Sequence, residues 1–193
     1  HIYGLPVDMD PVLDLCQRYG LMLIEDAAEM IGQTYRGKCC GSFGDISTVS
    51  FYPNKHITTG EGGMILTDND DLAEQCRELR NLCFMHGRRF VHARLGWNLR
   101  MTNLQAALGV AQLERLDEFL LKKRWIGHLY NEYLSDLPGV QLPLAKTQFA
   151  ENIYWVYGLV LEDSIEFDAK EAISRIARFG VACRPFFCPM HQQ

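Results

Sequence analysis

The chain has 193 residues, with 19 Lys and Arg against 24 Asp and Glu, so its formal net charge is −5. Hydrophobic residues make up 48% and charged residues 22%, which are the proportions of a globular protein and exclude a disordered one. A net acidic chain is a poor general binder of nucleic acids and membrane surfaces, since both repel it. No apolar run approaches the roughly 18–20 residues of a membrane span, so we expect neither partner.

The N-terminal part is predicted to alternate helices with buried strands. A helix begins at Asp10, with Asp10 as its cap and Pro11 in the first helical position, and it ends at Gly20. The continuous apolar run Leu21–Ile24 is typical of a buried parallel strand. Two further strands and a helix are predicted over Ile46–Phe51, Met64–Thr67 and Asp70–Phe84. This order favours an α/β sheet.

The C-terminal part contains a long helical stretch and a smaller unit. Met85–Arg100 is predicted to be irregular, and Thr102 with Gln105 forms a capping box that opens the long stretch. Further elements are predicted as a strand over Tyr154–Leu161, a helix over Asp168–Phe179 and a strand start over Val181–Arg184. Tyr154 and Trp155 are assigned to the core. We place a domain boundary near residue 117, between a large α/β domain (1–116) and a linking helix with a small α+β domain (117–193).

The cysteines and the chain ends indicate a compartment. Seven cysteines without a C-x-x-C pair indicate free thiols in a reducing cytoplasm and no zinc site. The first residue is His1, without a charged and then apolar leader, so no signal peptide is expected. We interpret both ends as cuts through a longer protein.

Three features carry potential chemistry. The run Glu25–Glu29 follows a predicted strand, and the carboxyl ends of parallel strands are where such sheets bind ligands. Ser50–Lys55 ends another strand, and Thr58–Gly63 is a glycine-rich turn without the G-K-[ST] of a P-loop. Each has a structural alternative when taken alone: a solvated loop, a surface lysine, and a turn that needs positive φ.

In combination and in order, these features resemble the active-site run of fold-type-I pyridoxal 5′-phosphate (PLP) enzymes. More narrowly, they resemble the DegT/DnrJ/EryC1/StrS family of sugar aminotransferases. The matching segments extend over nearly the whole chain, namely His1–Gly4, Ile24–Glu29, Gly41–Asp45, Ser50–Gly63, Gly96–Thr102, Gln112–Asp117 and Arg184–Phe187. The resemblance implies a fold-type-I PLP-transferase-like large domain that lacks its N-terminal part, and the start of a small α+β domain.

The resemblance also implies a role for each motif residue. Lys55 forms the Schiff base with PLP and then moves the proton during amino transfer. Asp26 pairs with the pyridine nitrogen, and Ser50 donates its hydroxyl to the PLP phosphate. Ala28 is small enough for the ring to lie against it, and Glu29 lies near the ring hydroxyl.

Other residues are implied at the edges of the site. Asn98 resembles a residue that reaches the PLP phosphate of a neighbouring subunit, which implies a homodimer with shared sites. Candidate substrate contacts are His56, Arg88, Arg184 and His191. A structural loop histidine is the alternative for His56. The basic segment His86–Arg94 is either a solvated face or a contact to the diphosphate of a sugar nucleotide.

The implied reaction moves an amino group from L-glutamate to the 4-keto carbon of a nucleotide-linked 4-keto-6-deoxysugar, as in the perosamine-synthase-like subgroup. Such products feed polysaccharide biosynthesis. Two alternatives stay open. One is a PLP-dependent sugar dehydratase of the same family, which carries His in place of the lysine and is therefore disfavoured by Lys55. The other is a non-catalytic truncated relative.

Overall fold

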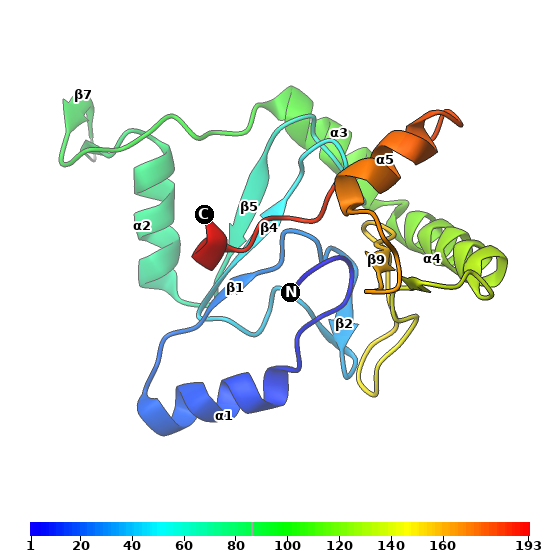
Figure 1. Ribbon diagram of the computed structural model, residues 1–193. Helices are drawn as coiled ribbons and strands as arrows, with labels where there is room; N and C mark the ends of the chain where they lie inside the picture. The colour runs from blue at the N-terminus through cyan, green and yellow to red at the C-terminus, as the bar shows by residue number, and fades with distance from the viewer. Residues whose placement is uncertain (86) are drawn as a thin grey trace.

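A three-stranded sheet lies at the centre of the computed structural model, which describes residues 1–85 and 87–193. Its strands are β1 (Ile24–Asp26), β4 (Ile46–Ser50) and β5 (Gly63–Leu66), in the order β1-β4-β5 (Figure 1). β1 is parallel to β4, with Asp26 opposite Thr48, whereas β5 is antiparallel to β4. Because β1 and β4 run in the same direction, their carboxyl ends bring Asp26 and Ser50 to one edge of the sheet.

Two helices flank this sheet (Figure 1). Helix α1 (Met9–Tyr19) ends at Gly20, where φ is +61°, as predicted. Its N-cap is Asp8 instead of Asp10, because the extended backbone lies at Asp8 and its carboxylate accepts from the backbone N–H of Asp10. Helix α2 (Asp70–Arg80) is shorter than predicted. Leu82 and Cys83 both have positive φ, which a helix does not tolerate.

The C-terminal helices are α3 (Asn103–Leu113), α4 (Leu116–Leu134), α5 (Ala169–Ala177) and a short 3₁₀ helix (Met190–Gln192). The predicted capping box of Thr102 and Gln105 is present at the start of α3. The predicted long helical stretch is divided into α3 and α4 at residues 114–115. Among the described residues, no helix combines the length and the apolar character that crossing a membrane requires.

The remaining strands form three short antiparallel pairs: β2 (Thr34–Tyr35) with β3 (Lys38–Cys39), β6 (Phe84–Met85) with β7 (Arg88–His92), and β8 (Val140–Gln141) with β9 (Val160–Leu161). The pair of β6 and β7 lies in the segment predicted to be irregular. The strand predicted over Tyr154–Leu161 is wrong except for β9, because φ at Tyr154 is +46° and breaks an extended run. The predicted strand at Val181–Arg184 is an exposed coil.

The capping box of α3 gives a first testable prediction. Thr102 Oγ1 accepts from the N–H of Gln105, and Gln105 Oε1 accepts from the N–H of Thr102 at 2.9 Å. We expect Thr102→Ala to lower the free energy of unfolding of the full-length protein by about 1 kcal/mol, because an N–H at the helix start loses its acceptor. Urea denaturation measures this. Thr102→Ser keeps the hydroxyl and should unfold like the parent, and an equal loss in both variants would contradict the assignment.

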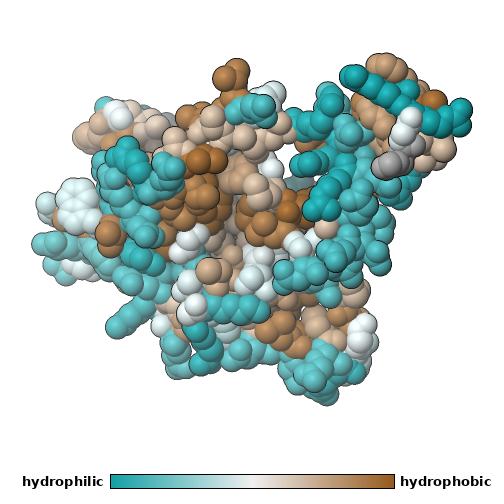
Figure 2. All heavy atoms as spheres, turned by 180° about the vertical axis from the view of Figure 1, so that it is seen from behind, coloured by the Kyte–Doolittle hydropathy of each residue, from teal (hydrophilic) through white to brown (hydrophobic). Residues whose placement is uncertain are grey.

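The best-packed residues lie beside the sheet instead of along it. Ala27, Met30 and Ile153 are fully buried, whereas Ile24 and Ile65 in the strands are 72% and 50% exposed. Figure 2, seen from behind Figure 1, shows apolar atoms gathered across the middle of this face. A groove of about 980 Å³ is lined by residues of β4, β5, α2 and the segment before α3. One face of the sheet is therefore uncovered in the described chain.

Candidate functional site

The two residues predicted at the sheet edge lie at the ends of neighbouring strands. Asp26 ends β1, and its side chain is exposed, with Oδ1 accepting from the N–H of Ala28 at 3.0 Å. Ser50 ends β4 and is half-buried, with Oγ accepting from the N–H of Tyr52 at 3.2 Å. The Ser50 hydroxyl proton remains available to donate, and among the described residues no cation forms an ion pair with Asp26.

Lys55 lies in the loop that follows β4 and faces Glu29. The Lys55 side chain is 10% exposed, and its Nζ lies 3.9 Å from Glu29 Oε1. Burial lowers the pKa of Lys55, and the negative charges of Glu29 and Asp26 oppose that change. Burial likewise raises the pKa of Glu29, against a 2.6 Å hydrogen bond from the N–H of Tyr3 and the charge of Lys55. The structure thus brings Asp26, Glu29 and Lys55 into one electrostatic group.

The glycine-rich turn is held beside this group by α3. Gln112 uses both ends of its amide, accepting from the N–H of Thr58 at 3.1 Å and donating to the carbonyl of Thr58 at 2.6 Å. Gln105 donates to the carbonyl of Glu61 at 3.1 Å. The turn at Gly60 has a φ of +81°, where glycine avoids backbone strain. The turn therefore closes the loop that carries Lys55.

The other predicted residues lie in different places. His56 is 9% exposed and its Nε2 lies 3.1 Å from the carbonyl oxygen of Ile153; burial lowers its pKa to about 4. This position favours the structural alternative for His56. Arg88 in β7, Arg184 and His191 are all exposed, and within the described part of the chain none of them forms a hydrogen bond or ion pair with Lys55. His86, in the basic segment His86–Arg94, lies outside the described residues.

Asn98 and Ala28 differ in their relation to the group. Ala28 is half-buried two residues after Asp26, so its methyl group lies at the same end of β1. Asn98 is exposed, and its Oδ1 accepts from Arg100 Nε at 2.9 Å. Within the described part of the chain, Asn98 makes no hydrogen bond to Asp26, Ser50 or Lys55.

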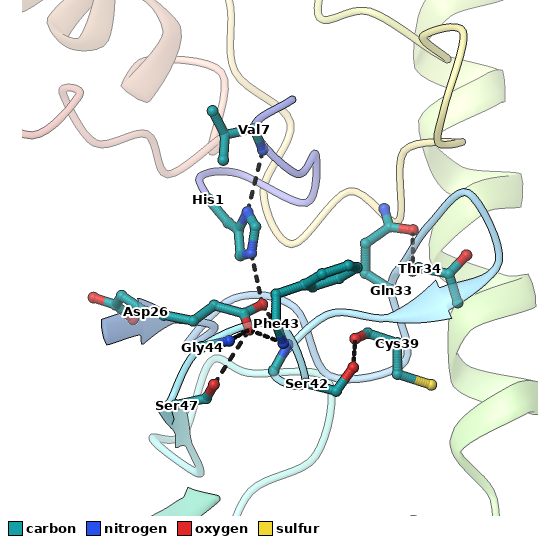
Figure 3. Close-up of polar contacts among 12 residues, drawn as sticks. His1, Val7, Asp26, Gln33, Thr34, Cys39, Ser42, Phe43, Gly44 and Ser47 are labelled. Atoms are coloured by element: carbon teal, nitrogen blue, oxygen red, sulfur yellow. Dashed lines mark hydrogen bonds and ion pairs between the residues drawn. The ribbon is translucent and has the colours of Figure 1, made fainter. Parts of the chain in front are cut away.

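The neighbouring carboxylate of Glu25 is structural. Glu25 is 4% exposed and accepts from the N–H groups of Gly41, Phe43 and Gly44 and from the Ser47 hydroxyl (Figure 3). His1 Nε2 lies 2.8 Å from the same carboxylate. The sequence placed Glu25 in the carboxylate run without a role. Only the burial and the five partners reveal that it organises the loop after β3.

One further group of potential metal ligands includes this carboxylate. The ligand atoms of His1, Glu25 and Cys40 lie within 4.8 Å of one another. Burial, followed by the charge of Glu25, raises the pKa of the Cys40 thiol to about 12, so the thiol stays protonated. Both oxygens of Glu25 are already occupied by hydrogen bonds. We therefore assign this cluster to the structure of the loop.

Three aromatic residues that form a cluster beside Lys55 were missed as site residues. Trp155 was assigned to the core and is indeed 6% exposed, but Lys55 Nζ lies 3.8 Å from the centre of its ring. Tyr3 stacks on Trp155 with ring centres 5.9 Å apart. The C-terminal Phe187 joins them, 5.6 Å from the Tyr3 ring. No spacing in the sequence relates residues 3, 155 and 187, so no local signal could have found this cluster.

The residues present fit PLP. The accessible carboxylate of Asp26 suits the pyridine nitrogen of the cofactor, and the Ser50 hydroxyl at a strand end suits its phosphate. The buried amine of Lys55 suits its aldehyde. The small side chain of Ala28 leaves room beside Asp26.

Comparisons with known proteins agree with this fit. The model of the DegT/DnrJ/EryC1/StrS aminotransferase family matches residues 1–193. A GDP-perosamine synthase of Caulobacter vibrioides is 43% identical over 191 residues, and one of Vibrio cholerae is 41% identical over 191 residues. Each alignment covers 99% of this chain and 52% of the relative. The chain thus spans about half the length of the curated relatives it matches.

Solved structures show the same fold. The aminotransferase TlmJ of Streptoalloteichus hindustanus superposes with a TM-score of 0.89 at 29% identity, covering 99% of this chain and 51% of TlmJ. A DegT DnrJ EryC1 StrS aminotransferase of Brucella abortus gives 0.85 at 26% identity, covering 100% and 50% of the two chains. The architecture is the mixed α/β fold of these aminotransferases. With Asp26 and Ser50 at one edge of the sheet, Lys55 facing Glu29, and its whole length matched, the chain belongs to the DegT/DnrJ/EryC1/StrS aminotransferase family.

Proposed function

We propose that this chain is part of a PLP-dependent aminotransferase that moves an amino group from L-glutamate to the 4-keto carbon of a nucleotide-linked 4-keto-6-deoxysugar. The observation that carries the proposal is the buried Lys55, which lies beside Glu29 and is influenced by the negative charge of Asp26. The choice of sugar follows the relatives named GDP-perosamine synthase. A lysine at this position favours amino transfer over the dehydratase alternative.

Each residue of the group has a task that its geometry supports. PLP, when bound, supplies the electron sink that makes bonds at the amino-bearing carbon labile. Lys55 holds the cofactor and moves the proton, and the burial that lowers its pKa increases the share of neutral, nucleophilic amine. Asp26 keeps a positive charge on the pyridine nitrogen. Ser50 donates a hydrogen bond to the phosphate, and Glu29 orients Lys55.

The uncovered sheet fits a large domain of which this chain contains only a part. We assign residues 1–116 to a large PLP-binding domain without its N-terminal part, and residues 117–193 to the linking helix and the start of a small domain. Ile24 and Ile65 lie on the same face of the sheet, since the register pairs Ile24 with Ile46 and Ile65 with Thr48, and they are 72% and 50% exposed on a face of the kind that globular proteins bury. The missing part of the large domain would cover this face.

The complete enzyme is proposed to be a cytoplasmic homodimer. All seven cysteines are free, which fits a reducing compartment. Asn98 is exposed and separate from Lys55, which fits a residue that serves the site of a second subunit. The exposed Arg88 is a proposed contact to the diphosphate of the sugar nucleotide, because a guanidinium group binds phosphate with two donors. The exposed Arg184 and His191 are proposed contacts to the substrate carboxylate or the sugar.

A reconstituted assay tests the reaction. The full-length protein is incubated with PLP, L-glutamate and GDP-4-keto-6-deoxymannose, and both products are measured by mass spectrometry. We expect 2-oxoglutarate and a GDP-linked 4-amino sugar in equal amounts, because each amino group that leaves glutamate is delivered to one sugar.

The alternatives give different results in the same assay. A dehydratase would consume the sugar with loss of oxygen and without an equal amount of a 4-amino sugar. A non-catalytic relative would leave both substrates unchanged and would show no covalent PLP at Lys55 after borohydride reduction. Either result would remove the aminotransferase assignment.

A further inference from the structure

The ring of Trp155 lies directly against the amine of Lys55. Lys55 Nζ is 3.8 Å from the ring centre, well inside the distance of about 6 Å at which a cation is attracted to an aromatic face. Glu29 Oε1 lies 3.9 Å from the same nitrogen. Among the described residues, no hydrogen bond from Nζ is found, so the carboxylate and the aromatic face are what hold the amine.

Trp155 is itself fixed on several sides. Its indole N–H donates to the carbonyl of Asn54 at 3.0 Å, and Asn54 is the residue before Lys55. Its own carbonyl accepts from Lys123 Nζ at 3.0 Å. The Tyr3 ring stacks on it with an angle of 13° between the planes. A ring held in this way has little freedom to move away from Lys55.

The two residues before Trp155 add a second connection to the loop that carries Lys55. Ile153 is fully buried, and its carbonyl lies 3.1 Å from the ring nitrogen of His56, the residue after Lys55. Tyr154 has a φ of +46°, a conformation that packing must hold in place. The backbone before Lys55 and the side chain after it are therefore both tied to the segment Ile153–Trp155.

We propose that Trp155 is a positioning residue for Lys55, whose ring holds the free ammonium and whose indole N–H fixes the backbone beside it. The contact between Trp155 and Lys55 does not depend on the proposed function. Its importance for catalysis does, since there Lys55 must be held in place whenever it is not bonded to the cofactor. The charged groups that face Lys55 are Glu29 and Asp26. His56, on the other side of the loop, is neutral at pH 7.

Competitive acylation of Lys55 tests the role of the ring. The full-length protein, freed of PLP, is labelled with acetic anhydride at a series of pH values, and the peptide with residue 55 is quantified by mass spectrometry. Trp155→Phe and Trp155→Leu both remove the indole N–H and leave side chains of similar size, but only Phe keeps an aromatic face. We expect the midpoint of labelling in Trp155→Leu to lie about half a unit to one unit below that in Trp155→Phe, because the ammonium loses the attraction of the ring.

Two controls separate this effect from a general loosening of the fold. Lys170 is exposed on α5 and should keep one midpoint in all variants. Trp125, 58% exposed on α4, provides the matched variant Trp125→Leu, which should leave Lys55 unchanged. If Trp155→Leu does not fold, Trp155→Met replaces it in the comparison with Phe.

The outcomes are distinct from those of the reaction assay. Equal midpoints in the Phe and Leu variants, or a higher midpoint in Leu, would overturn the positioning role even if the parent transfers amino groups. A parent that binds no PLP but shows the expected difference between Phe and Leu would overturn the proposed function and leave the contact between Trp155 and Lys55 established.

Discussion

Lys55→Arg is expected to abolish covalent capture of PLP and to lower amino transfer by at least about 10²–10⁴-fold, the contribution of a positioned proton-transfer group. The guanidinium keeps the charge beside Glu29 but cannot lose its proton in a protein, so it provides no nucleophilic nitrogen. Borohydride reduction of the PLP-loaded protein, followed by peptide mass spectrometry, reads out the covalent bond. Turnover of L-glutamate reads out the chemistry.

The matched control for this experiment is Lys170→Arg. Lys170 is exposed on α5, far in sequence from the group around Lys55, and its substitution should change neither PLP capture nor turnover. If the Lys55→Arg protein retains full turnover, or if reduction attaches PLP to another lysine in the parent, then Lys55 is not the residue that holds the cofactor.

Glu25→Ala is expected to lower the free energy of unfolding of the full-length protein by about 3–5 kcal/mol. The substitution leaves the N–H groups of Phe43 and Gly44 and the hydroxyl of Ser47 without their acceptor in a buried place. It also leaves His1 without its carboxylate. Urea denaturation measures the loss, and the slope of the transition shows whether the unfolded state has changed as well.

Two further variants serve as controls for the Glu25→Ala measurement. Glu25→Gln keeps a carbonyl oxygen as an acceptor, so its loss should lie between those of the parent and Glu25→Ala. Glu74→Ala removes a carboxylate of the same type from the exposed face of α2, where its ion pair with Arg77 is worth at most about 1 kcal/mol. A loss at Glu25 no larger than that at Glu74 would show that the buried network does not stabilise the loop.

The features that could be predicted from the sequence are those that neighbours in sequence determine. The capping box of Thr102 and Gln105 needs only a spacing of three residues, and the end of α1 at Gly20 needs only one left-handed residue. The residues around Lys55 were found through an ordered set of motifs, and the structure brings Asp26 and Glu29 to it.

The features that were missed depend on contacts between distant residues. The apolar run at Leu21–Ile24 predicted a strand three residues too early, because Glu25 behaves as a buried residue only through partners 16 to 22 positions further along. The strand predicted from Tyr154 failed because φ at Tyr154 is +46° and because the residue before it, Ile153, bonds to Gly4 and His56 instead of to a neighbouring strand. Trp155 was correctly placed in the interior, but its contact with Lys55 connects positions 100 residues apart.

The cluster of Tyr3, Trp155 and Phe187 also has a consequence for how the protein folds. The Tyr3 hydroxyl accepts from the N–H of Phe187, 184 positions away, so this contact closes almost the whole chain into one loop. Such a closure has a large entropic cost and is formed only after the local helices and turns exist. The cluster of Tyr3, Trp155 and Phe187 should therefore be among the last parts of the molecule to form. A newly made chain should become able to bind PLP covalently later than its helices become detectable by circular dichroism.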